Sequence, residues 1–115
     1  MSLFTLIGRV QDGLLLAGSQ HDSYELADLK RQAKRILKNI KSSQQKVSID
    51  AGNYIFHYLI ERDIVYLVLV DSSYPTGLAF TYLHELFETF DAKHGDSVYG
   101  FDSPWACISF SAYAP

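Results

Sequence analysis

Apolar residues in the first part of the chain predict a β-hairpin. Residues 3–10 and 14–17 are rich in β-branched and other apolar side chains, and Gln11-Asp12-Gly13 stands between the two runs. An Asp-Gly pair between two apolar runs is a strong hairpin signal. We therefore expect the chain to begin with two antiparallel strands.

Three further strands are predicted over residues 47–50, 53–60 and 64–70, with turns at Ala51-Gly52 and Glu61-Arg62-Asp63. The first of these segments alternates apolar and polar residues, as a half-buried edge strand does. The last is apolar on both of its sides. A strand of that kind must be covered on both faces, so helices should lie above and below the sheet.

The clearest helix lies between the hairpin and these three strands, beginning near Tyr24. Its apolar residues recur at helical spacing over an arc of about 100°; they are Leu26, Leu29, Ala33, Ile36, Leu37 and Ile40. Basic residues occupy the adjoining arc of about 140°; they are Lys30, Arg31, Lys34, Arg35, Lys38 and Lys41.

A second helix is predicted after Pro75, a residue that suits a first helical turn. Its apolar stripe consists of Ala79, Tyr82, Leu83, Leu86, Phe87 and Phe90, and Glu85, Glu88 and Asp91 lie opposite. The element order is strand-strand-helix-strand-strand-strand-helix. It favours one α+β domain, a five-stranded antiparallel sheet with helices on both faces.

Composition agrees with a single folded domain. The chain has 115 residues, of which 48% are hydrophobic and 20% charged, and this excludes a disordered chain. No apolar run approaches the roughly 20 residues that span a bilayer. The single cysteine, Cys107, excludes an internal disulfide.

Charge is divided unevenly along the chain. The net charge is −3, yet residues 1–46 carry +4 and residues 47–115 carry −7. The acidic total argues against a nucleic-acid partner. The basic face of the first helix, represented by Lys30, Lys34, Lys38 and Lys41, could contact an acidic membrane surface or an acidic partner. The alternative interpretation is an ordinary solvated helix face.

Residues able to carry catalysis or bind a cofactor form no convincing motif. His84 and Glu88 resemble part of a zinc motif, but the second histidine of that motif is missing, so a solvated helix face is the better interpretation. His57 lies in an apolar strand and is expected to be a satisfied core histidine. Cys107 is expected to be a small buried thiol. The residues therefore favour a binding function over catalysis, and no metal or cofactor is expected. A small enzyme built on this fold is kept as an alternative.

Five segments carry a resemblance to a known family: Phe4-Thr5-Leu6-Ile7-Gly8-Arg9-Val10 with Asp12-Gly13-Leu14, then Ala51-Gly52-Asn53-Tyr54-Ile55-Phe56-His57-Tyr58-Leu59-Ile60, Leu78-Ala79-Phe80-Thr81-Tyr82-Leu83, Phe90-Asp91-Ala92-Lys93-His94-Gly95 and Ser103-Pro104-Trp105. Together they resemble the longin domain family, most closely the amino-terminal domain of R-SNAREs of the Sec-twenty-two type. Each motif is weak alone, but their order and spacing are specific. The resemblance covers Leu3 to about Phe110, so residues 1–110 are expected to form the domain.

The resemblance implies a profilin-like fold with strand order 2-1-5-4-3, one helix on one face and two on the other. It also implies a non-enzymatic role in transport between endoplasmic reticulum and Golgi, at the cytoplasmic face of these membranes and of transport vesicles. The resemblance implies that the domain regulates SNARE assembly and cargo sorting by binding a SNARE segment, its own or a partner's, or a coat component in a groove. Here that groove would lie beside the first helix and third strand and use Leu29, Ala33, Ile36, Leu37, Val47 and Ile49. The pattern leaves open which side of the helix packs on the sheet, the one with Leu29, Ala33 and Leu37 or the one with Ile36 and Ile40. Ala33 is the most informative position, because a small and partly exposed residue there would leave room for a guest side chain.

The chain departs from the family pattern at its end. Residues 111–115 stand where a third helix would begin, and neither SNARE heptads nor a membrane anchor is present. Either an excised domain or a natural truncation explains this. Without the third helix, apolar surface should be exposed and promote homo-oligomers. The alternative function is a longin-like subunit of a coat adaptor or tethering complex.

Overall fold

A computed structural model describes residues 2–13, 15–18, 27–40 and 45–94. The elements are β1 (Ser2–Arg9), β2 (Leu15–Gly18), α1 (Ala27–Asn39), β3 (Lys46–Ala51), β4 (Tyr54–Glu61), β5 (Ile64–Asp71) and α2 (Thr76–His94). This is the element order that the hydrophobic pattern predicts. The expected helix start near Tyr24, the residues Leu26 and Lys41, the thiol of Cys107 and the chain end after residue 94 lie outside the described residues.

The strands form one antiparallel sheet in the order β2-β1-β5-β4-β3. The order implied by the longin resemblance is therefore confirmed. Two-residue turns close the last two hairpins. Arg62 and Asp63 both have positive φ, 51° and 63°, as a type I′ turn requires, and Gly52 has a φ of 72°.

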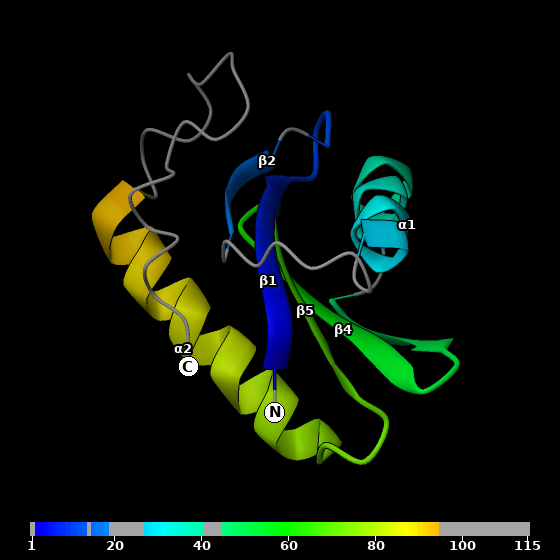
Figure 1. The fold of residues 1–115 in the computed structure, drawn as a ribbon. Coiled ribbons are helices and arrows are strands. Elements are labelled where there is room, and N and C mark those ends of the chain that lie inside the picture. The colour runs from blue at the N-terminus through cyan, green and yellow to red at the C-terminus, as the bar shows by residue number, and fades with distance from the viewer. Residues whose placement is uncertain (1, 14, 19–26, 41–44, 95–115) are drawn as a thin grey trace.

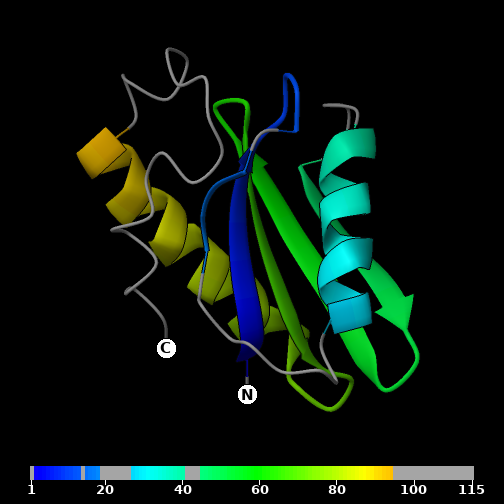
Figure 2. The ribbon, with the colours of Figure 1, turned by 45° about the horizontal axis from the view of Figure 1, so that its top comes forward.

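The two helices cover opposite faces of the sheet (Figures 1 and 2). Alternate residues of the central strand β5 point to the two sides: Val65, Leu67 and Leu69 pack in the core under α1, and Ile64, Tyr66, Val68 and Val70 in the core under α2. The prediction that an all-apolar strand needs cover on both faces is thus confirmed.

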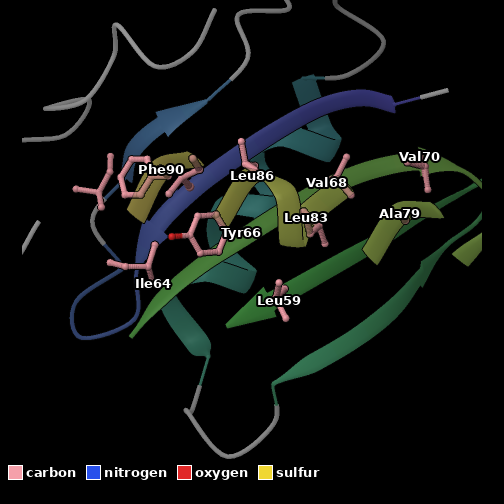
Figure 3. Packing of buried hydrophobic residues seen from close by; sticks show 11 residues of the cluster. Leu59, Ile64, Tyr66, Val68, Val70, Ala79, Leu83, Leu86 and Phe90 are labelled. Carbon is pink, nitrogen blue, oxygen red and sulfur yellow. The ribbon is translucent and has the colours of Figure 1, made fainter. Parts of the chain in front are cut away.

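Helix α2 contributes its predicted apolar stripe to the second core. Ala79, Leu83, Leu86 and Phe90 are buried, and in Figure 3 Leu83, Leu86 and Phe90 lie near the ring of Tyr66, whereas Ala79 lies further along the sheet, near Val70. That ring meets Phe90 edge to face, with centroids 6.0 Å apart, an arrangement that aromatic pairs prefer.

The turn between β1 and β2 is fixed against the end of α1. Gly13 has a φ of 72°, and a Cβ there would lie 3.1 Å from the backbone Cα of Lys38. The buried side chain of Arg9 holds the same turn by donating from Nε and Nη2 to the Asp12 carboxylate at 3.0 and 2.6 Å. Glycine is required here both for its backbone conformation and for the close approach of α1.

The expected apolar surface is not found on the described part of the chain. Among these residues Leu78, at 56% exposure, is the only exposed large apolar side chain. A single exposed leucine is ordinary for a soluble domain. The described residues therefore give no support to oligomerisation through an extended apolar patch.

Candidate functional site

Helix α1 places two rows of apolar side chains differently. The row formed by Leu29, Ala33 and Leu37 is buried against the sheet, and Ala33 has no exposed surface. Ile36 and Ile40 lie on the adjoining side of the helix and are only half-buried. The expectation that Ala33 is partly exposed is therefore wrong, because α1 is rotated so that this residue faces the core.

A groove of about 320 Å³ opens between α1 and the β3–β4 hairpin. Its lining consists of Gln32, Arg35, Ile36, Asn39, Ile49 and Phe56, and we refer to it as the α1–β3 groove. Its floor is apolar: Ile49 and Phe56 are paired across β3 and β4, and Ile36 faces them from α1. The three polar residues all come from α1 and form one rim.

Only part of the predicted groove set lines this groove. Ile36 and Ile49 do so. Val47 lies two residues away on the same face of β3 and packs, partly buried, on the core below α1. Leu29, Ala33 and Leu37 support the groove from behind, inside that core.

Four lining residues were missed by the sequence prediction. Gln32, Arg35 and Asn39 recur at helical spacing beside Ile36, so the period of the helix contained a signal for them. Phe56 belongs to β4, and only the β3–β4 register brings it next to Ile49.

The free edge of β3 borders the groove. Among the described strands, β3 is the last of the sheet and pairs only with β4. The amide of Ile60 donates to the carbonyl of Gln45 at 2.8 Å, which makes residues 45 and 60 a hydrogen-bonded pair. Because such pairs alternate along an antiparallel ladder, Lys46, Ser48 and Asp50 direct their N–H and C=O groups away from β4. An extended peptide could bond to these outward groups.

The basic face of α1 is largely exposed. Lys34, Arg35 and Lys38 are exposed, and within the described part of the chain they form no ion pair. Lys30 is half-buried, and Arg31 pairs with Asp28. Glu85, Glu88 and Asp91 belong to α2, which lies across the sheet. The expected separation of basic and acidic helix faces is therefore present.

His57 is buried on the α2 side of β4, with 1% of its surface exposed. Its Nδ1 lies 2.7 Å from the Ser48 hydroxyl, and its ring meets Phe80 edge to face at 5.3 Å. Its Nε2 is buried and has no hydrogen-bond partner among the described residues. Burial lowers the pKa of His57 because desolvation disfavours the charged ring. The core placement predicted for this residue is confirmed, although only one ring nitrogen is satisfied.

A second hollow, of about 550 Å³, lies on the α2 side of the molecule. Charged side chains of both signs line it, including Lys46, Glu85 and Glu88. The aromatic residue of this hollow is Phe80, and the Lys46 ammonium group lies over its ring, 5.9 Å from the ring centroid. Within the described ranges no three histidine, cysteine or acidic side chains are grouped so as to bind a metal. The α1–β3 groove is thus the better candidate for an apolar guest.

The strand order, the helices on opposite faces and the groove beside the edge strand together define the class of protein. The family model of the longin domain, described as a regulated-SNARE-like domain, matches residues 16–114. The chain belongs to the longin family.

Its relatives are vesicle-transport proteins. The chain is 42% identical over 118 residues to vesicle-trafficking protein SEC22b of Xenopus tropicalis, covering 98% of this chain and 55% of the relative. It is 39% identical over 119 residues, with the same coverage, to the 25.3 kDa vesicle transport protein SEC22-1 of Arabidopsis thaliana. It is 44% identical over 97 residues to protein transport protein SEC22 of Yarrowia lipolytica, covering 83% of this chain and 46% of the relative.

These matches confirm the resemblance to the longin domain of Sec22-type R-SNAREs. The chain spans about half the length of these relatives. In the part of the chain that the structure describes, no helix is long and apolar enough to cross a membrane.

Proposed function

We propose that this domain is a non-enzymatic regulatory module of a vesicle-trafficking SNARE, and that it controls SNARE assembly by holding an extended SNARE segment in the α1–β3 groove. The names of its relatives support the trafficking role. The observation that carries the binding mode is the coincidence of an apolar groove with strand-edge groups that no described strand pairs with. Partner strands commonly add to such edges, where backbone bonds give affinity and side-chain pockets give specificity.

Binding in this mode would inhibit SNARE assembly for a simple conformational reason. A segment added to β3 is extended, whereas SNARE segments pair as helices in a coiled-coil bundle. One stretch of chain cannot adopt both conformations at once, so capture by the groove withdraws it from the bundle. The held segment can come from the same protein or from a partner SNARE.

The same proposal places the domain at the cytoplasmic face of endoplasmic reticulum, Golgi and transport-vesicle membranes. A coat component that sorts the SNARE into vesicles is the other proposed occupant of the groove. The alternative is a longin-like subunit of a coat adaptor or tethering complex. The coding transcript separates the two: SNARE heptads followed by about 20 apolar residues favour the SNARE.

Titration calorimetry with a SNARE-derived segment tests the groove. Ile36→Gln should weaken binding about tenfold by removing an apolar contact. The matched control is Leu78→Gln, which also replaces an aliphatic side chain by glutamine but at an exposed site on α2, across the sheet, and it should bind like the parent chain. Equal loss in both variants, or in neither, would place the binding site elsewhere.

Asp50→Pro tests strand addition separately from the groove. Proline removes the outward-facing N–H of an edge residue and leaves the bonds between β3 and β4 in place. Its thermal melt should stay close to that of the parent chain, while segment binding is lost. Retained binding in a folded Asp50→Pro variant would show that the guest does not pair with β3.

A further inference from the structure

The α1–β3 groove contains one cation that has no ion-pair partner in the part of the chain that the structure describes. Arg35 is the only charged residue among the six that line it. It makes no ion pair with any described residue. The nearby hydrogen bond, in which Asn39 Nδ2 donates at 2.8 Å, uses the Arg35 carbonyl and not its guanidinium group.

No carboxylate of β3 compensates this charge. Side chains of successive strand residues alternate between faces. Val47 and Ile49 face α1, so Asp50 points to the α2 face, away from Arg35. A guanidinium group offers donors in a planar fork that matches a carboxylate. The guest is therefore the natural source of a carboxylate at this rim.

A second copy of this chain fits the site poorly. Antiparallel pairing of two β3 edges would set Lys46 opposite Asp50, but it would also place both α1 helices on one face of a joined sheet. The exposed cations Lys34, Arg35 and Lys38 would then occur twice along the joint groove. Like charges brought together in this way oppose association.

We propose that the α1–β3 groove selects an extended segment in which an apolar residue and a carboxylate stand two positions apart, the apolar side chain on Ile36 and Ile49 and the carboxylate on Arg35. This proposal rests on the function proposed above and adds the chemistry of the guest. Residues two apart in a strand lie on the same face, about 6.8 Å from one another. Both side chains can therefore face α1 while the intervening residue points to the other side of the sheet.

Three synthetic peptides of nine residues test the pattern by fluorescence anisotropy. Each has a threonine and serine background with one isoleucine. The first carries glutamate two positions after the isoleucine, the second carries glutamine there, and the third carries glutamate three positions after it. The parent chain should bind the first peptide about fivefold more tightly than either of the others, and added salt should reduce that preference.

Two protein variants locate the effect. Arg35→Gln should bind all three peptides equally, with its melt unchanged because the side chain is exposed. Lys34→Gln removes a neighbouring exposed cation that does not line the groove, and it should keep the preference. If both variants lose the preference for the first peptide to the same extent, the effect is due to general charge attraction and the proposed role of Arg35 is wrong.

Other results overturn the proposal in distinguishable ways. If the parent chain binds the glutamate and glutamine peptides equally, and Ile36→Gln still weakens both, the groove stands and the carboxylate selection is wrong. If Ile36→Gln changes no peptide affinity, the proposed function itself fails. Recovery on phosphatidylserine vesicles that falls in Arg35→Gln, with peptide binding unchanged, would assign the cation to a membrane surface. A dimer in sedimentation that Asp50→Pro abolishes would assign the edge to a second copy.

Discussion

A tyrosine placed at two neighbouring positions of α1 should have opposite consequences. Ala33 has no exposed surface and packs in the core under α1 with residues such as Leu37 and Phe56. Ile36, one turn further along the helix, is half-buried and lines the α1–β3 groove. Ala33→Tyr should unfold the domain more readily, whereas Ile36→Tyr should fill the groove and leave the fold intact.

The cost at position 33 follows from its surroundings. Overpacking a core costs about 1–3 kcal/mol and occasionally more, and a buried hydroxyl without a partner adds about 1–3 kcal/mol. We expect Ala33→Tyr to lose roughly 3–5 kcal/mol, a large part of the 5–15 kcal/mol typical of a domain. For a chain of this size that loss lowers the melting temperature by about 10–20 °C. Ile36→Tyr should stay within about 1 kcal/mol of the parent chain, since its ring can extend into the open groove.

Thermal and urea unfolding followed by far-ultraviolet circular dichroism measure both changes. Segment binding measured on the folded Ile36→Tyr variant completes the comparison and should be lost. An Ala33→Tyr variant that melts within about 3 °C of the parent chain would refute the placement of Ala33 in the core. The rotation of α1 on the sheet, and with it the position of the groove, would then have to be reconsidered.

Two further predictions concern stability. Because burial lowers the pKa of His57, the folded state binds fewer protons than the unfolded state as the pH falls. The contribution of His57 to the free energy of unfolding is therefore complete above the unfolded pKa of about 6.5 and is lost as the pH falls through the folded pKa. Urea unfolding between pH 7.5 and 5.5 should show this decline, and His57→Leu should reduce its slope; an unchanged slope would contradict the assignment. Gly13→Ala should cost about 2 kcal/mol or more, because its Cβ would crowd the Lys38 backbone as well as require positive φ. Gly52→Ala is the control, because position 52 also needs positive φ but has nothing within 4 Å of an added Cβ, and it should cost about 1 kcal/mol in urea unfolding. Equal losses of stability in the Gly13 and Gly52 variants would refute the close approach of Gly13 to the Lys38 backbone.

The sequence was most informative where periodicity alone determines the structure. The apolar run over residues 64–70 predicted a strand covered on both faces, and alternation over residues 47–50 predicted an edge strand; both are found. Strand order required the family resemblance, because antiparallel patterns do not state which strands are neighbours. The element boundaries differ by one or two residues, as at the Gly52-Asn53 turn.

The groove was harder to predict because a helical wheel gives an apolar arc but not its rotation on the sheet. Both sides of the α1 arc are apolar, so nothing in the pattern decides whether Ala33 or Ile36 faces the core. The structure decides by packing the small side chain against the sheet, which lets the helix approach closely. Phe56 joins the site through strand register, which depends on the whole hairpin rather than on its own neighbours.

The position of β1 between β2 and β5 has a consequence for folding during synthesis on the ribosome. β1 pairs along most of its length with β5, from Ser2 with Val70 to Arg9 with Ile64, so the two partners are more than fifty residues apart in the sequence. Synthesis proceeds from the N-terminus, and the first hairpin therefore emerges well before the strand that will lie beside it. β3, β4 and β5 form two consecutive hairpins, whose pairing is local in the sequence and can take place as soon as these strands have been synthesised. The sheet is complete only when β1 pairs with β5. Until then β1 and β5 each have one long unpaired edge that can pair with another chain and cause aggregation.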